Sequence, residues 1–183
     1  MQRRCIIHSS LFIKHMLLFT PFTKRTLLPV NRVTSMSSRA CLKKHAFDTI
    51  IMEDTKMIKA GIIGATGYAG NEIVRLLLGH KNVEVAWYGS RSYIDKKYAG
   101  IYQNFFKLVD AKCMDDNMEA LADEVDVIFT ATPQGLCASL VNEGILSRAK
   151  VIDLSADFRI KDVKKYEKWY GIEHKSPQFI EEA

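Results

Sequence analysis

The chain has 183 residues, enough for one domain with a sizeable core, and 48% of them are hydrophobic. Its net charge of +5 is unevenly placed, because residues 1–56 carry ten Lys and Arg against three Asp and Glu, whereas residues 57–183 carry 16 against 18. The basic excess therefore belongs to a leader, and the remainder offers no basic surface of the kind that binds nucleic acid. The four cysteines, Cys5, Cys41, Cys113 and Cys137, are scattered, so neither a disulfide framework nor a zinc site is indicated.

The leader has the composition of a targeting segment. Residues 1–47 contain no acidic residue and mix basic residues with Ser, Thr and short apolar patches, as organellar transit peptides do. Its apolar patch, residues 11–22, is interrupted by charge and proline and is too short to span a bilayer. Alternatively the leader is a misassigned start, since Met57 stands directly before the first predicted strand. We expect residues 1–56 to be disordered and dispensable. The protein is then cytoplasmic, or organellar if the leader is genuine.

A strand, a glycine turn and a helix follow Met57. Residues 58–63 are an apolar run, as expected of a strand buried on both faces of a parallel sheet. After the turn, residues 71–78 have helical spacing and end at a glycine, and residues 83–88 predict a second strand. In such a βαβ unit, backbone N–H groups at the start of the helix bind phosphate. Gly64 and Gly67 let the backbone approach an anion, and Gly70 lets the helix pack closely on the strand.

The residues after the second strand bear on the choice between NAD and NADP. NAD-binding domains carry an acid there for the ribose 2′-hydroxyl, whereas this chain continues Gly89-Ser90-Arg91-Ser92. Arg91 can pair with a 2′-phosphate, and the two serines can donate hydrogen bonds to it. Such a charge-assisted bond contributes about 1.5–3 kcal/mol, or about ten- to a hundredfold in affinity. The sequence therefore predicts NADP; the alternative is a solvated loop arginine.

Further along, residues 95–114 are irregular. We expect their aromatic residues, Tyr102, Phe105 and Phe106, to cover the sheet and their lysines to face solvent. Residues 117–122 predict a short helix and residues 125–130 a buried strand, which ends in Ala131-Thr132-Pro133-Gln134-Gly135. Ligands of open α/β sheets bind beyond the carboxyl ends of strands, so this loop either lies against the dinucleotide or is an ordinary turn.

Two candidate reactive groups follow that loop. Cys137 is predicted to be a small buried helix residue rather than a nucleophile, because no nearby His or Lys favours its thiolate. After a helix over 138–146, a strand over 150–154 leads into Ser155-Ala156-Asp157-Phe158-Arg159. Either Ser155 and Arg159 face the substrate or nicotinamide, or Asp157 and Arg159 cap the next helix. Residues 161–170 are a charged amphipathic segment. The pattern predicts an α/β fold, a Rossmann-type doubly wound parallel sheet that is incomplete.

Residues 57–183 resemble the amino-terminal part of N-acetyl-gamma-glutamyl-phosphate reductases. The glycine motif is shared with aspartate-semialdehyde dehydrogenase and other dinucleotide enzymes, whereas the two runs nearest the carboxyl end are more specific. Gln134 departs from the histidine often found in the family's Pro-x-Gly loop. The resemblance lies in Gly61–Gly70, Ser90-Arg91, Ala131–Gly135, Ile152–Arg159 and Tyr166–Gly171.

The resemblance implies an NADP-binding Rossmann domain in residues 57–183 of an enzyme that reduces N-acetyl-gamma-glutamyl phosphate to N-acetylglutamate semialdehyde in arginine biosynthesis. It implies a cysteine nucleophile and a histidine acid-base, both beyond Ala183, so the chain alone is expected to bind NADP weakly or not at all and to be inactive. A homo-oligomeric full-length enzyme is implied, with an acyl phosphate as its small-molecule substrate and without metal, nucleic acid or membrane. The implied cofactor-binding residues are Gly64, Ala65, Thr66, Gly67, Tyr68, Ala69, Ser90, Arg91, Thr132, Pro133 and Gln134, with Ser155 and Arg159 on the substrate side. An aspartate-semialdehyde dehydrogenase-like enzyme and a non-catalytic NADP-binding module are the alternatives.

Overall fold

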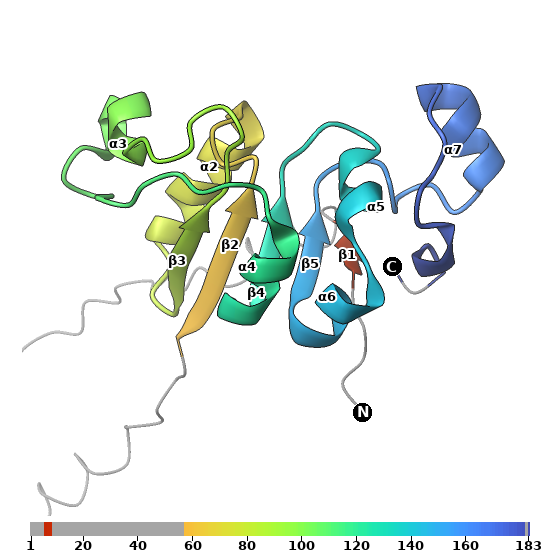
Figure 1. Cartoon of the computed structure of the whole chain (residues 1–183), viewed down its shortest axis with the longest axis horizontal. Coiled ribbons are helices and arrows are strands. Elements are labelled where there is room, and N and C mark those ends of the chain that lie inside the picture. The colour runs from red at the N-terminus through yellow and green to blue at the C-terminus, as the bar shows by residue number, and fades with distance from the viewer. Residues whose placement is uncertain (1–5, 9–56, 182) are drawn as a thin grey trace, which may run out of the picture.

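The computed structural model describes residues 6–8, 57–181 and 183, which contain a parallel sheet of five strands in the order β1-β5-β4-β2-β3 (Figure 1). Because all neighbouring strands are parallel, their carboxyl ends meet at one edge, where the loops of interest lie. The predicted strands are confirmed, with ends that differ by two residues or fewer. The strands are β1 (Ile6–His8), β2 (Ile58–Ile63), β3 (Val83–Tyr88), β4 (Val127–Thr130) and β5 (Lys150–Asp153).

Six α-helices connect or follow these strands in the described residues, and one prediction about them was wrong. The helix expected over 138–146 is two helices, because Asn142 adopts an extended conformation with φ −142° and its side chain accepts a hydrogen bond from the Ile145 N–H at 2.9 Å. An asparagine in that role begins a new helix. The helices are α2 (Tyr68–Leu78), α3 (Tyr98–Ile101), α4 (Met118–Glu124), α5 (Leu136–Leu140), α6 (Glu143–Arg148) and α7 (Val163–Tyr170), with 3-10 turns η1 (Gln103–Phe105) and η2 (Pro177–Phe179).

Helices cover both faces of the sheet, as a doubly wound fold requires. Side chains of a strand alternate between faces, so Ile63 and Ile128 pack with α4, α5 and α6, whereas Ile62 and Phe129 pack with α2 and α3. Figure 1 shows α4 and α6 in front of the sheet and α2 behind it. The strands are therefore buried on both sides, which explains their continuous apolar runs.

The leader contributes one short strand. Ile6–His8 pair in parallel with Val151–Asp153 at the edge of the sheet, which corrects the expectation that the whole leader is disordered. The β-branched residues Ile6 and Ile7 suit an extended strand, a local preference that the compositional argument overlooked. The other leader residues lie outside the described residues. Within the described part of the chain, no helix combines the length and the apolar character needed to cross a membrane.

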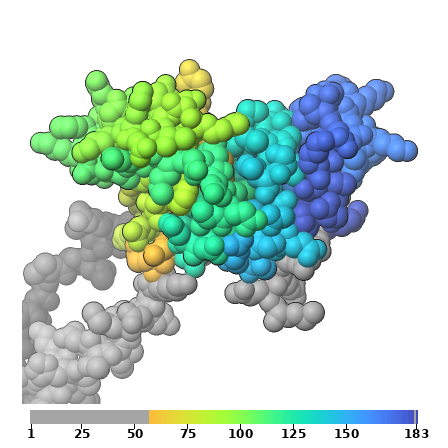
Figure 2. Space-filling model, viewed as in Figure 1, coloured from red at the N-terminus to blue at the C-terminus, as the bar shows by residue number. Residues whose placement is uncertain are grey.

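The segment between β3 and α4 contains α3 and η1 and forms one end of the molecule; Figure 2 shows it in green, opposite the blue α7 segment. Tyr98 and Phe105 lie in the core, and Lys96 and Lys97 are exposed. Phe106, which was expected to cover the sheet, is instead 69% exposed; it follows the last residue of η1, and the next residue, Lys107, has a left-handed backbone with φ 63°. The segment returns along the end of β3, where Gly89 pairs with Met114. This pairing brings residues 113–116 to the edge of the sheet that carries the glycine turn.

Candidate functional site

The turn between β2 and α2 has the geometry of an anion-binding site. Gly64 has a φ of +76°, and a Cβ there would lie 2.5 Å from the Ala131 carbonyl oxygen. At Gly70 a Cβ would lie 2.1 Å from the Gly64 oxygen, so the close packing of helix on turn needs both glycines. Gly67 caps α2 without a side-chain hydrogen bond, and there is no acid in the first turn of the helix. Its first N–H groups are therefore available to a phosphate.

Two tyrosines from the α3 segment hold this turn, and sequence analysis missed their role. The Tyr102 hydroxyl donates to the Thr66 carbonyl oxygen at 2.8 Å, and the Tyr98 hydroxyl donates to the Ala65 carbonyl oxygen at 3.0 Å. Burial raises the pKa of both tyrosines, so they keep the protons that they donate. The two tyrosines therefore hold the turn through its carbonyl groups, while the Ala65 N–H donates to the Gly89 carbonyl oxygen at 2.8 Å and the Gly67 N–H to the Gly64 carbonyl oxygen at 3.0 Å.

Ser90 and Arg91 lie directly after β3, beside the turn. The Ser90 hydroxyl is buried and lies 2.7 Å from the Thr66 hydroxyl, which joins the two loops. The Arg91 side chain is 65% exposed, and its Nε lies 3.2 Å from Asp116 Oδ2. The arginine is thus anchored at one nitrogen, while most of its side chain is exposed.

Asp116 is the acid that no local pattern revealed. Sequence analysis found no acid at the end of the second strand, yet the pairing of Gly89 with Met114 brings Asp116 there. Burial raises the pKa of the Asp116 carboxyl, and the Arg91 guanidinium and the Gly64 N–H oppose that rise. Its Oδ1 is buried without a hydrogen-bond partner among the described residues. Asp116 therefore contacts both the glycine turn and Arg91.

The Ala131–Gly135 loop lies on the other side of the turn. The Ala131 N–H donates to the Ile63 carbonyl oxygen at 2.9 Å, and Pro133 and Gln134 are exposed. Thr132 Oγ1 is buried and has no hydrogen-bond partner in the described part of the chain. Gly135 has a φ of +85°, which lets the chain enter α5 directly.

Neither interpretation of residues 155–159 anticipated their contacts. Asp157 caps the preceding helix α5, not the following one, by accepting hydrogen bonds from Gly135 N at 2.7 Å and Ala138 N at 3.0 Å. Asp162 caps α7 by accepting from Lys165 N at 3.2 Å. Only the fold brings Asp157 to α5, since this helix and Asp157 follow neighbouring strands of the sheet.

The two substrate-side candidates differ in exposure. The buried Ser155 hydroxyl donates to Asp153 Oδ2 at 2.6 Å and accepts from the Asp157 N–H at 3.1 Å. Arg159 is exposed beyond the end of β5. The Ser155 hydroxyl is therefore hydrogen-bonded within its own loop, whereas the Arg159 side chain lies at the surface.

Cys137 is fully buried in α5, as predicted. Its Sγ lies 3.3 Å from Thr130 Oγ1, and burial raises the pKa of the thiol well above its usual value of 9.0. A buried thiol of this kind is a weak nucleophile.

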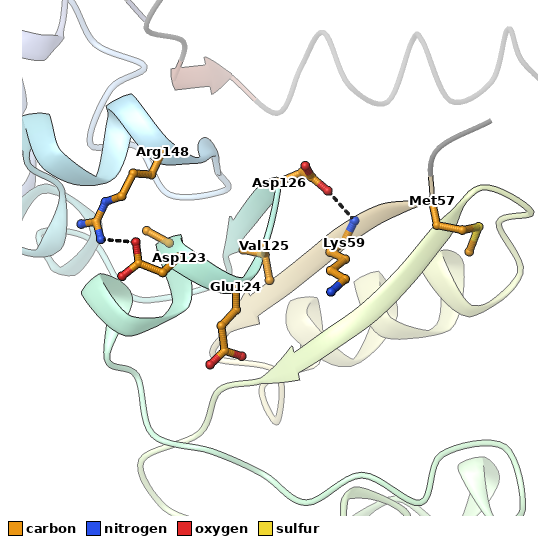
Figure 3. A pocket seen from close by; sticks show the side chains of 8 residues that line it. Met57, Lys59, Asp123, Glu124, Val125, Asp126 and Arg148 are labelled. Atoms are coloured by element: carbon orange, nitrogen blue, oxygen red, sulfur yellow. Dashed lines mark hydrogen bonds and ion pairs between the residues drawn. The ribbon is translucent and has the colours of Figure 1, made fainter. Parts of the chain in front are cut away.

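A cavity of about 420 Å³ lies at the opposite edge of the sheet, beside the start of β2 and the residues that precede β4 and β5 (Figure 3). Asp126 Oδ2 accepts from the Lys59 backbone N–H at 2.9 Å, and Arg148 pairs with Asp123 at 2.6 Å. It contains none of the predicted site residues. The predicted site residues lie instead at the carboxyl edge of the sheet.

A parallel sheet with an uncapped helix start after a glycine turn, a basic residue after the next strand and a loop on the other side defines a dinucleotide-binding domain of the Rossmann type. Comparison with known families identifies it further. The chain belongs to the family described as semialdehyde dehydrogenase, NAD binding domain, whose model matches residues 59–183. The cofactor of this family is a nicotinamide dinucleotide.

Curated relatives are similar over the same region. The N-acetyl-gamma-glutamyl-phosphate reductase of Lachnospira eligens is 76% identical over 127 residues, which are 69% of this chain and 36% of that protein. The protein of the same name from Lachnoclostridium phytofermentans is 68% identical over 127 residues, or 37% of its length. The chain thus spans little more than a third of these relatives. A solved structure of aspartate semialdehyde dehydrogenase with NADP from Candida albicans aligns at a TM-score of 0.45 and 24% identity, over 59% of this chain and 32% of that one.

Proposed function

We propose that residues 57–183 are the NADP-binding domain of an N-acetyl-gamma-glutamyl-phosphate reductase, an oxidoreductase that forms N-acetylglutamate semialdehyde. The observation that carries the proposal is the 76% identity over 127 residues to a reductase of that name. That identity favours this enzyme over an aspartate-semialdehyde dehydrogenase. The acyl phosphate is then the substrate of the whole enzyme, and the cofactor, when bound, supplies the hydride.

The glycine turn supports a role in binding the pyrophosphate. Residues 64–67 lead into α2, whose first N–H groups, from Tyr68 onward, lack a side-chain cap, and Gly64 lets the turn pack closely against Ala131. Tyr68, at the first position of the helix, is 98% exposed and can cover a bound phosphate or the adjoining ribose. The first turn of α2 contains no acidic residue, so no negative charge there repels the phosphates of the cofactor.

Ser90 and Arg91 would hold the 2′-phosphate that distinguishes NADP from NAD. The exposed guanidinium, anchored through Nε to Asp116, leaves its outer nitrogens for the phosphate oxygens. Asp116 could instead serve as the acid for a ribose hydroxyl, but its free oxygen Oδ1 is buried and its other oxygen is paired with Arg91. The geometry therefore favours NADP.

The other predicted residues would line the nicotinamide half. Thr132, Pro133 and Gln134 follow β4 and adjoin the glycine turn, and the buried Thr132 hydroxyl has no hydrogen-bond partner among the described residues. Arg159, exposed beyond β5, is the substrate-side candidate for a carboxylate or phosphate. Ser155 would support the conformation of its loop and would not contact the substrate itself, since its hydroxyl is bonded to Asp153.

The experiment is a binding titration of the 183-residue chain with NADP and NAD, followed by NMR of backbone amides, which measures dissociation constants into the millimolar range. Arg91→Glu should weaken NADP binding about tenfold or more, the loss of a bond of about 1.5–3 kcal/mol, and change NAD binding less than about twofold. Arg75→Glu is the matched control: it makes the same charge change in the last turn of α2, where Arg75 pairs with Glu72. Undiminished NADP binding by Arg91→Glu would refute the assignment of the 2′-phosphate site.

A further inference from the structure

A buried polar cluster lies behind the Ala131–Gly135 loop, and the proposed function gives it no part. Its members are Asp157, Tyr166, His174 and Ser176, all at most 4% exposed. Burying polar groups costs free energy unless they are hydrogen-bonded, so a cluster of four calls for a reason. We propose that Asp157 and Tyr166 are positioning residues, which hold the turn from Pro133 to Ala138 in the conformation that receives the nicotinamide half of the cofactor. The inference rests on the proposed function.

The Asp157 carboxylate is the centre of the cluster. It accepts hydrogen bonds from Gly135 N at 2.7 Å and Ala138 N at 3.0 Å, and from the Tyr166 hydroxyl at 2.8 Å. Burial and the neighbouring carboxylate both raise the pKa of Tyr166, which keeps its hydroxyl a donor. Gly135 has no side chain with which to cap α5, so Asp157 supplies the cap from a different strand end. The conformation of the turn therefore depends on where Asp157 lies, and Tyr166 fixes one of its oxygens.

His174 and Ser176 close the cluster from a second side. His174 Nδ1 accepts from the Ser176 N–H at 3.2 Å, which leaves the ring proton on Nε2 to donate to the Asp157 carbonyl oxygen at 2.7 Å. The Ser176 hydroxyl donates to the Ala138 carbonyl oxygen at 2.5 Å. The His174 ring also contacts the Tyr166 ring edge-on, with centroids 5.0 Å apart. The first turn of α5 is thus held through its N–H groups and through a carbonyl group.

The strand order assigns this turn to one half of the cofactor. Arg91 follows β3, the glycine turn follows β2, and Pro133 follows β4, on the other side of β2. A dinucleotide with its 2′-phosphate at Arg91 and its pyrophosphate at the glycine turn must extend its remaining half toward β4. A shift of the Pro133–Ala138 turn should therefore affect the nicotinamide half and leave the adenosine half unchanged.

The test compares NADP with adenosine 2′,5′-bisphosphate, which contains the adenosine half and its 2′-phosphate but no nicotinamide. Tyr166→Phe removes one hydroxyl from the cluster; Tyr170→Phe, on the same helix with a 40% exposed side chain, is the control. Because only part of the loss of one hydrogen bond to a carboxylate reaches the cofactor through the turn, we expect Tyr166→Phe to weaken NADP binding by about three- to tenfold and to change bisphosphate binding less than about twofold. Tyr170→Phe should change neither.

Equal losses for both ligands, or no loss for either, would overturn the inference, because a merely structural role of Tyr166 has no reason to distinguish them. If Tyr166→Phe does not fold, Ser176→Ala takes its place and must show the same selective loss; an unchanged ratio of the two affinities in it would equally reject the inference. Weak binding, in the millimolar range, is sufficient for this comparison. A wild-type chain that binds neither ligand at millimolar concentration refutes the assignment of the cofactor sites to these residues alone, and the inference fails with it. A wild-type chain that binds both, with variants that bind alike, overturns the inference alone.

Discussion

Replacing Gly70 by alanine should destabilise the protein, whereas the same replacement at Gly100 should stabilise it. Gly70 in α2 and Gly100 in α3 would undergo the same chemical change, but a Cβ at Gly70 would lie 2.1 Å from the Gly64 oxygen and 2.8 Å from the Ala65 Cα, whereas at Gly100 the nearest atom is 3.9 Å away. Alanine normally stabilises a helix by about 0.5–1 kcal/mol relative to glycine. At Gly70 that gain is outweighed, because overpacking costs about 1–3 kcal/mol and the contacted atoms are backbone.

The gain in helix propensity is common to both variants, so the expected difference in the free energy of unfolding between Gly70→Ala and Gly100→Ala is the overpacking cost, about 1–3 kcal/mol. Urea unfolding followed by tryptophan fluorescence measures it, since Trp87 is buried in the core and reports on its loss. Because a chain of 150–250 residues shifts its Tm by about 2–4 °C per kcal/mol, thermal unfolding should separate the two variants clearly. Equal midpoints for the two variants, or a more stable Gly70→Ala protein, would show that the turn does not require the close approach seen here.

Three other predictions concern single side chains of the same edge. Tyr102→Phe should lower the free energy of unfolding by about 0.5–1.5 kcal/mol, measured in urea, through loss of its bond to Thr66, and an unaltered midpoint would contradict that role. Cys137 should resist a thiol reagent under native conditions and react only as fast as the chain opens, so rapid labelling at neutral pH would refute its structural assignment. Burial raises the pKa of the Asp153 carboxyl above its usual 3.8 in the native state. The native protein therefore binds this proton more tightly than the unfolded chain does. As a result, the free energy of unfolding should fall as the pH rises through the window above 3.8. Asp153→Asn should flatten this dependence in urea titrations at several pH values, and an equally steep profile would argue against it.

The sequence predicted those parts of the site that are local. The glycine turn, the strands on either side of it and the place of Arg91 follow from short patterns, because each depends on residues adjacent in the chain. The prediction of one helix over 138–146 was wrong for a local reason too: apolar periodicity continues through Asn142, but the preference of asparagine for the N-cap position begins a second helix there.

What could not be predicted lies in contacts between distant segments. Asp116 contacts Arg91 because Met114 pairs with Gly89. No pattern in residues 95–114 predicts that pairing. Tyr102 and Thr66 are likewise 36 residues apart. Such contacts depend on the path of an irregular segment, for which neither helical nor strand periodicity gives a signal.

These distant contacts divide the site into two separately supported halves. On the β3 side, the α3 segment holds the glycine turn through Tyr102 and anchors Arg91 through Asp116. On the β4 side, the segment after β5 holds the Pro133–Ala138 turn through Asp157. The glycine turn joins the two, since Gly64 lies against Ala131 on one side and Thr66, two residues further on, contacts Ser90 on the other. Changes in the segment after β5 should therefore affect only the nicotinamide half of the cofactor, whereas changes in the α3 segment, which holds the glycine turn, should affect both halves.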